Sequence, residues 1–153
     1  MSLKTDEAGV VVACPACQQP NRIKFSKLDA QPRCAKCKQT IPLVSQPVEI
    51  GSARQFDALV GEAPLPVLVD FWAPWCGPCH AVAPEVEKVA HSLRGRLLVG
   101  KVNTDLLPEL GSRYQVRSIP TLAVFVNGRE SGRVSGVVPA AEIVKLVDRG
   151  VEG

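Results

Sequence analysis

Two cysteines separated by two residues follow directly after a strand-forming run, and this junction constrains the fold more than any other feature of the chain. The run Val67–Trp72 is apolar apart from one Asp, and Cys76 and Cys79 come shortly after it. Apolar residues then recur at helical spacing, which predicts a strand–turn–helix unit with both thiols at the turn. Such a pair can close and reopen a disulfide, which is a two-electron redox centre. Beside a β-α-β pattern, the pair favours redox chemistry over half of a zinc site or a structural pair.

The position of each thiol in this unit predicts its role. Pro78 is tolerated in a first helical turn, so the helix is expected to begin at Cys76. Free N–H groups and the helix dipole favour a thiolate there, and we expect Cys76 to be the more exposed, attacking sulfur. Cys79 lies one turn inside and is expected to be the resolving sulfur. Pro84 falls within the same helical pattern and predicts a kink.

The residues around this unit resemble thioredoxin. Residues 69–79 read VDFWAPWCGPC, and residues 118–121 read SIPT further along the chain. The match runs from about Pro47 to the C-terminus. It implies an α/β fold with a mixed sheet and helices on both faces. It also implies a cis peptide bond before Pro120, packed against the redox pair, where sequence alone favours a trans turn proline.

Two further residues receive catalytic roles through this resemblance. Asp70 lies in an otherwise apolar run, so burial should raise its pKa and allow proton exchange with a thiol. The alternative is an Asp at a strand end that reaches water. Lys101 resembles the family lysine near that Asp, and alone it would be an ordinary strand lysine. His80 stands where the family commonly has Lys or Arg. It either makes the charge near the redox pair depend on pH or is an exposed helix residue of little effect.

The resemblance also implies a flat apolar surface around the disulfide that would bind extended protein substrates. The residues expected to form it are Trp75, Gly77, Pro78, Ile119, Pro120, Gly136 and Val137. The expected catalytic set is Cys76, Cys79, Asp70, Lys101 and Pro120.

The remaining cysteines form a second pattern, with C-x-x-C at Cys14 and Cys17 and again at Cys34 and Cys37. Sixteen residues separate the two pairs, which suits a site with four thiolate ligands and one Zn²⁺. Two alternatives are a pair of disulfides and a second redox pair activated by basic neighbours. Zinc knuckles often carry Gly after the second Cys, whereas this chain has other residues there, Gln18 and Lys38. The chain as a whole resembles the thioredoxin-2 type, which adds an N-terminal zinc-binding extension.

These patterns predict two domains, a zinc-ribbon-like module at residues 1–44 and a thioredoxin-like redox domain at residues 45–153. The Pro-containing residues 41–47 form the expected linker. The module is expected to make one short strand, at residues 22–25, and no core of its own, so metal should be needed to fold it. The redox core is expected not to include residues of the module.

The redox domain is expected to contain the following elements. The expected strands are residues 48–50, 67–72 and 97–103, with a hairpin of residues 121–126 and 129–135 around Asn127 and Gly128. Helices are expected from a capping pattern at Ser52 and Gln55, after Cys76, across residues 108–114, and from Pro139 to a stop at Gly150.

Composition limits the compartment and the partners. Apolar residues make up 46% of the chain, enough for a packed core, and a net charge of +3 does not indicate nucleic acid. Val10–Ala13 is too short for a signal-peptide core, and no run is long enough to span a membrane. We therefore expect a cytoplasmic monomer that uses no organic cofactor and does not bind membranes.

Two classes of function fit these residues. The first is a protein-disulfide reductase that transfers electrons through Cys76 and Cys79 and, by resemblance, is recycled by an NADPH-dependent thioredoxin reductase. The second is a zinc-ribbon adaptor or redox-sensing module whose thioredoxin-like domain docks a partner. The two intact thiols, Cys76 and Cys79, favour the first, because an adaptor does not need both.

Overall fold

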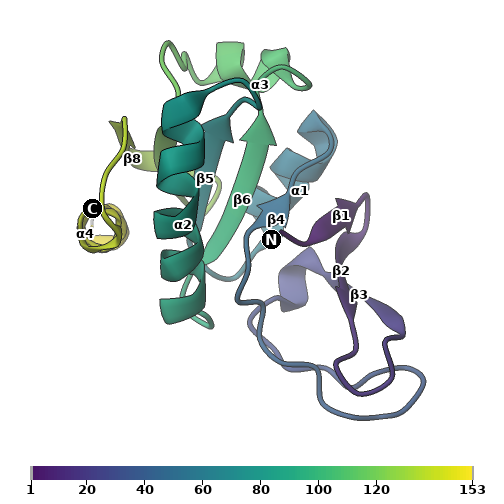
Figure 1. Ribbon diagram of the computed structural model, residues 1–153. Helices are drawn as coiled ribbons and strands as arrows, with labels where there is room; N and C mark the ends of the chain where they lie inside the picture. Colours follow the sequence, from purple (N-terminus) through teal and green to yellow (C-terminus); the bar gives the residue numbers. More distant parts are fainter. Residues whose placement is uncertain (1, 153) are drawn as a thin grey trace.

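The computed structural model describes residues 2–152 (Figure 1). These residues form a five-stranded sheet that lies between helices and, nearer the N-terminus, a separate three-stranded sheet. The strands are β1 (Lys4–Asp6), β2 (Gly9–Ala13), β3 (Pro20–Lys24), β4 (Val48–Glu49), β5 (Val67–Trp72), β6 (Leu98–Asn103), β7 (Thr121–Val126) and β8 (Arg129–Ser135). The helices are α1 (Ala53–Glu62), α2 (Gly77–Ser92), α3 (Pro108–Arg113) and α4 (Ala140–Glu152), with a short 3-10 turn at Phe25–Lys27.

The larger sheet is mixed, as the sequence predicts. Its strand order is β4-β6-β5-β7-β8, with β4, β6 and β5 parallel and β7 and β8 antiparallel to their neighbours. The apolar strand β5 lies at the centre, between β6 and β7. Its C-terminal end leads directly into the turn that carries Cys76. The pairing of β7 with β8 contains a bulge between Val124 and Phe125.

Helices cover both faces of this sheet, which confirms the expected architecture. Helices α2 and α4 pack over one face through apolar side chains such as Val86, Val89 and Ile143. The opposite face packs against α1 and α3, where Phe56 meets Phe125 edge to face. Within residues 2–152, no helix combines the length and the apolar character needed to cross a membrane.

The helix ends agree with the sequence except at the C-terminus. Ser52 caps α1 by accepting the N–H of Gln55 at 3.1 Å. Gly150 was expected to end α4, but the helix continues to Glu152. Gly150 instead permits close packing, because a Cβ there would lie 2.7 Å from Ser131 Oγ and 3.0 Å from Val124 Cγ1.

The N-terminal module contains more regular structure than the sequence suggested. Strands β1, β2 and β3 form an antiparallel sheet, although only a strand at residues 22–25 was expected. That strand begins earlier, at Pro20, and the buried Phe25 opens the 3-10 turn that follows it.

The module and the redox domain share one core, so the expectation of a separate redox core was wrong. Buried Ile23, Phe25 and Leu28 belong to the same apolar cluster as Phe56 and Leu59 of α1. The backbone joins the two parts as well. Leu3 donates its N–H to Pro47 C=O at 2.7 Å, and its C=O accepts the N–H of Glu49 at 2.6 Å. The module thus covers one side of α1 and the β4 edge of the larger sheet.

Candidate functional site

Cys76 and Cys79 form a disulfide at the start of α2, where the sequence places them. Their Cα atoms are 5.2 Å apart. Cys76 is the N-cap of the helix, and its Sγ accepts the N–H of Cys79 at 3.2 Å. This N–H and the positive end of the helix dipole would both stabilise a negative charge on Cys76 Sγ.

The two cysteine residues hardly differ in exposure in the disulfide form, whereas the prediction concerned the exposure of the Cys76 sulfur. Cys76 is 4% exposed and Cys79 is 3% exposed in this disulfide form. Both pack against Ala73 and against the partly buried Trp72 and Ile119. In this oxidised form the two residues are distinguished by hydrogen bonding and by position at the helix terminus rather than by access to solvent.

The loop before β7 lies against the disulfide. The peptide bond between Ile119 and Pro120 is cis, as the resemblance implies. Ile119 C=O lies 3.7 Å from Cys76 Sγ. Pro120 is buried, and its C=O accepts the N–H of Gly136 at 2.9 Å. Gly136 has φ +90°, a conformation that glycine adopts without strain.

Asp70 is buried in the centre of the sheet. Asp70 is 1% exposed, and its Oδ1 has no hydrogen-bond partner among the described residues. Burial raises the pKa of this carboxyl to about 6, and the charge of Lys101 partly offsets the rise. Lys101 pairs with Asp70 across β5 and β6, and its Nζ lies 4.8 Å from the ring centre of Trp72. An acid with this pKa can both take up and release a proton near neutral pH.

The expected docking residues divide between an open groove and its surroundings. A groove of about 870 Å³ runs beside the disulfide and is lined by Trp75, Cys76, Gly77, Pro78 and Ile119, together with residues of α3 and the loop after it. Trp75 is 72% exposed, and its Nε1 donates to the carboxylate of Asp105 at 3.0 and 3.2 Å. Val137 is 53% exposed but does not line the groove.

Sequence reasoning missed Asp105 and the side of the groove formed by Thr104 and residues 115–118. No local motif marks these residues, because they meet Trp75 and Cys76 only through the tertiary fold.

His80 is exposed and fixes the turn before the disulfide. Its Nε2 lies 2.7 Å from Pro74 C=O, so this nitrogen must carry the proton that is shared. The ring also contacts Trp72 edge to face, with 6.4 Å between centroids. His80 therefore contacts the segment that leads to Trp75.

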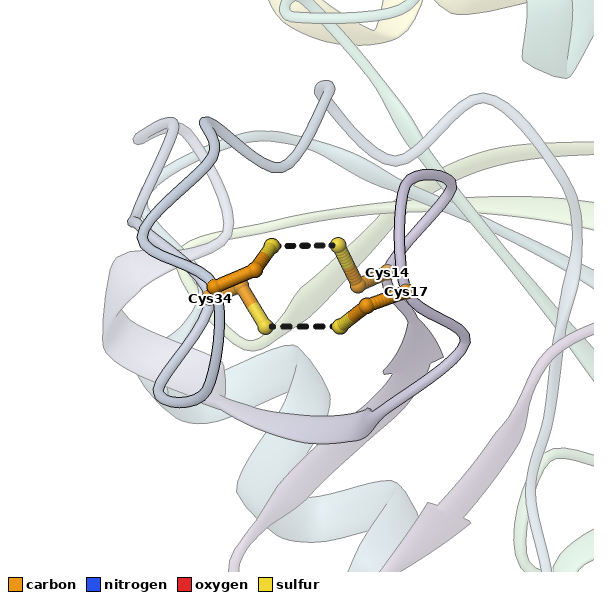
Figure 2. Close-up of side chains that lie close together, drawn as sticks. Cys14, Cys17 and Cys34 are labelled. Carbon is orange, nitrogen blue, oxygen red and sulfur yellow. Dashed lines mark hydrogen bonds between the residues drawn. The ribbon is translucent and has the colours of Figure 1, made fainter.

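The four remaining cysteines converge at the far end of the module (Figure 2). Their sulfurs all lie within 4.8 Å of one another. The two shortest separations join different knuckles, at 3.5 Å between Cys14 and Cys37 and 3.7 Å between Cys17 and Cys34. A tetrahedral zinc ion with Zn–S bonds of about 2.3 Å requires sulfurs about 3.8 Å apart. The sulfur positions therefore fit one Zn²⁺.

The two knuckles have the same backbone despite lacking glycine. Gln18 has φ 67° and Lys38 has φ 66°, the left-handed conformation that glycine usually supplies at this position. In each knuckle the first cysteine C=O accepts from this residue, at 2.8 Å for Gln18 N–H and 3.0 Å for Lys38 N–H. The departure in sequence therefore does not alter the knuckle.

Two thiols of this cluster have pKa values that are shifted in opposite directions. Hydrogen bonds from the N–H of Cys37 and from the Asn21 amide lower the pKa of Cys34 to about 6. The N–H of Gln39 lowers the pKa of Cys37, but burial and hydrogen bonds with the other three thiols outweigh it and raise the value to about 11. A bound dication would offset two of the four negative charges of a four-thiolate set and so favour the ionised thiols.

Asn21 joins the two knuckles. It lies on β3, and its Nδ2 donates to Gln19 C=O at 2.9 Å and to Cys34 Sγ at 3.5 Å. Its Oδ1 accepts the N–H of Ala35 at 3.0 Å. One side chain thus connects the first knuckle to a sulfur and to the backbone of the second.

Two family models match the chain. A model described as Thioredoxin matches residues 47–149, and a zinc-ribbon model described as Thioredoxin 2, N-terminal, matches residues 13–39. The first match includes the disulfide, and the second includes all four clustered cysteines.

Individual proteins give the same result. Thioredoxin C-3 of Corynebacterium nephridii is 34% identical over 140 residues, which cover 92% of this chain and 94% of that protein. A chloroplastic M-type thioredoxin of Chlamydomonas reinhardtii is 47% identical over 94 residues, or 61% of this chain and 67% of that protein. Among solved structures, a mutant thioredoxin from Halobacterium salinarum superposes with a TM-score of 0.63 at 31% identity, covering 68% of this chain and 89% of that one.

Proposed function

Because the chain belongs to the thioredoxin family of dithiol–disulfide oxidoreductases, we propose that it reduces protein disulfides with Cys76 as the attacking thiol and Cys79 as the resolving thiol. One observation carries this assignment: Cys76 Sγ is the acceptor at the N-cap of α2. A thiolate is stabilised more strongly at this position than at Cys79, which lies one turn further into the helix.

In the first step, the Cys76 thiolate attacks one sulfur of a substrate disulfide. The substrate S–S bond breaks, a mixed disulfide forms, and the other substrate sulfur leaves as a thiolate that takes up a proton. In the second step, the Cys79 thiolate attacks Cys76 Sγ, the mixed disulfide breaks, and the second substrate thiolate leaves. Two electrons have then passed from the protein dithiol to the substrate, and the Cys76–Cys79 disulfide has formed.

Asp70 and Lys101 are proposed to serve the proton transfers of these steps. The raised pKa of Asp70 suits a group that accepts the Cys79 proton as that thiol becomes a nucleophile. Lys101 lies beside Asp70 in the sheet and limits how far that pKa rises.

Substrates are proposed to bind on the exposed face around the disulfide. The exposure of Trp75, Pro78 and Val137 and the groove beside Cys76 support an extended segment of protein substrate there. Gly77, Ile119, Pro120 and Gly136 would contribute backbone at the same face, which suits a surface that accepts many sequences.

The N-terminal module is proposed to hold one structural Zn²⁺ through Cys14, Cys17, Cys34 and Cys37. The separations between their sulfurs and the two matching knuckles support this assignment over two disulfides. The ion would hold the two knuckles together at the far end of the module. We assign it no step in the redox reaction.

The physiological setting is a further part of this proposal. We propose that an NADPH-dependent thioredoxin reductase in the cytoplasm reduces the Cys76–Cys79 disulfide again after each cycle. We also propose that the protein acts as a monomer and uses this disulfide and no organic cofactor. Nucleic acid and membranes are not proposed as partners, in keeping with the modest net charge of +3. Residues 1–44 and 45–153 remain the proposed functional division of the chain, although the two parts share a core.

Reduction of insulin disulfides tests this function directly. The wild-type chain should precipitate the insulin B chain with dithiothreitol as reductant, and with NADPH plus thioredoxin reductase if that reductase is its partner. Activity with dithiothreitol but not with NADPH plus thioredoxin reductase would support the proposed disulfide reduction and exclude the thioredoxin reductase tested as a partner. Inactivity under both conditions would favour the adaptor function.

A further inference from the structure

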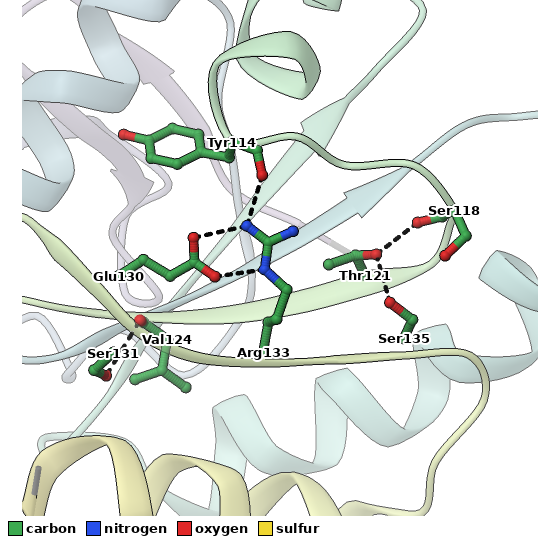
Figure 3. A network of polar contacts seen from close by, with 8 residues as sticks. All are labelled: Tyr114, Ser118, Thr121, Val124, Glu130, Ser131, Arg133 and Ser135. Carbon is green, nitrogen blue, oxygen red and sulfur yellow. Dashed lines mark hydrogen bonds and ion pairs between the residues drawn. The ribbon is translucent and has the colours of Figure 1, made fainter.

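The loop that faces Cys76 is held at both of its ends by side chains from strand β8 (Figure 3). At the first end, Arg133 Nη2 donates to Tyr114 C=O at 2.6 Å. At the second end, Thr121 Oγ1 donates to Ser118 C=O at 2.5 Å and lies 3.0 Å from Ser135 Oγ. Between these points lies Ile119, whose C=O is 3.7 Å from Cys76 Sγ.

Arg133 reaches Tyr114 at a carbonyl that α3 leaves free. The helix ends with Gln115 at φ 52°, and Val116 N–H donates back to Gly111 C=O at 2.8 Å. The N–H of Gln115 donates to Ser112 C=O at 3.1 Å, which completes a Schellman motif. The motif does not use the Tyr114 carbonyl, and a guanidinium at the C-terminus of a helix is favoured by the dipole.

A bulge in β8 makes this contact possible. Residues three apart in a regular strand point to opposite faces, so Glu130 and Arg133 should not meet. Here Val124 pairs with Gly132 and Phe125 pairs with Glu130, so Ser131 is the extra residue. Both charged side chains consequently reach the same face, and Arg133 binds Glu130 through Nε at 2.5 Å and Nη2 at 2.7 Å.

The ion pair of Arg133 and Glu130 is well suited to hold the guanidinium in one orientation. Its two hydrogen bonds are parallel, and the side chains of Arg133 and Glu130 are 34% and 23% exposed. An exposed ion pair contributes little to stability, whereas a bidentate, half-buried one orients the guanidinium. Ser135 lies two residues after Arg133 and so on the same face of β8, where it meets Thr121.

We propose that Arg133, oriented by Glu130, is a positioning residue for the redox reaction, which sets the placement of the loop of residues 115–120 opposite Cys76. This inference rests on the proposed function of the Cys76–Cys79 pair. Protein substrates need the backbone of this loop at a fixed distance from Cys76, whereas a small disulfide needs only the sulfur. Loss of Arg133 should therefore affect protein substrates selectively.

The test compares four variants with two substrates. In Arg133→Ala, kcat/KM for insulin should fall about tenfold, mainly through KM, while the rate with a small aromatic disulfide stays within about twofold of wild type. Glu130→Gln keeps the shape of the side chain but weakens its two hydrogen bonds with Arg133, and it should give a smaller fall in kcat/KM for insulin than Arg133→Ala. Arg133→Lys can still donate to Tyr114 C=O and should recover part of the insulin activity. Arg129→Ala is the matched control, because Arg129 is exposed on the same strand and should leave both rates unchanged.

Two outcomes would overturn the inference. One is an Arg133→Ala protein that matches Arg129→Ala with both substrates. The other is equal slowing of both substrates together with a lower melting temperature, which would make Arg133 a support of the fold only. If Arg133→Ala does not fold, Glu130→Gln and Arg133→Lys carry the same comparison. An inactive wild type would instead contradict the proposed function and would be seen in the same assay.

Discussion

The carboxyl group of Asp70 lies in the central strand of the sheet directly across from Lys101, yet its Oδ1 makes no hydrogen bond to the described residues. Burial raises the pKa of this group from 3.8 to about 6. The folded state therefore holds the proton more tightly than the unfolded chain does. Ionising Asp70 costs stability as the pH rises from about 4 to about 6, and the cost reaches about 3 kcal/mol above that window.

Asp70→Asn should remove this cost. The oxidised variant should be as stable as wild type near pH 4 and about 2–3 kcal/mol more stable near pH 8. Urea denaturation at both pH values measures the difference, with the exposed Asp148→Asn as a control that should show none. A wild type as stable as Asp70→Asn at the higher pH would mean that Asp70 ionises there without cost.

The shared core predicts that a module side chain stabilises the redox domain. Phe25 is 2% exposed and belongs to the cluster that contains Phe56 of α1. Phe25→Ala should lower the free energy of unfolding by about 3–5 kcal/mol. The chain has two tryptophans, Trp72 and Trp75, both in the redox domain, so their fluorescence in urea reports that domain. An unchanged fluorescence midpoint would show that the two parts unfold independently.

The metal site should depend on Asn21 as well as on its four thiols. Asn21→Ala removes the hydrogen bonds to Cys34 Sγ and Ala35 N–H. Zinc affinity, measured by competition with a chromophoric chelator, should fall about 10- to 100-fold. Gln19→Ala serves as the control, because the Gln19 side chain is exposed and, among residues 2–152, donates only to the C=O of neighbouring Pro20, at 3.3 Å. Equal affinities of the two variants would exclude a role for Asn21, and two disulfides with no zinc would exclude the site.

Two helical glycines should respond in opposite directions to a methyl group. Gly150→Ala places Cβ 2.7 Å from Ser131 Oγ and should cost about 1–3 kcal/mol. Gly61→Ala in α1 meets nothing within 4 Å and should add about 0.5–1 kcal/mol. Thermal unfolding of the two variants checks both signs. Stabilisation by Gly150→Ala would show that the end of α4 does not pack against β7 and β8 as described.

The strand–turn–helix unit was predictable because its signals are local. The apolar run of β5, the position of Cys76 before Pro78, and the Asn127–Gly128 turn each specify a conformation through neighbouring residues. The buried state of Asp70 followed from the same run. In each case the residues that decide the structure lie within a few positions of one another.

What sequence alone did not predict depends on contacts between distant segments. Val10–Ala13 was considered only as a signal-peptide core, and it lies in β2 (Gly9–Ala13), which β1 and β3 flank. Gln18 and Lys38 adopt the conformation of glycine because the knuckle hydrogen bonds impose it. Arg133 and Glu130 could not be paired from sequence, because a regular strand would separate them and the bulge is not visible in composition.

Trapping of the mixed disulfide tests the central claim most directly. A Cys79→Ser variant incubated with a disulfide-containing protein should form a covalent adduct through Cys76, visible by mass spectrometry and reversed by dithiothreitol, because the resolving thiol is missing. Cys76→Ser should form no such adduct and should not reduce disulfides. An adduct that forms through Cys79 in the Cys76→Ser protein, with none in Cys79→Ser, would reverse the assignment and contradict the account.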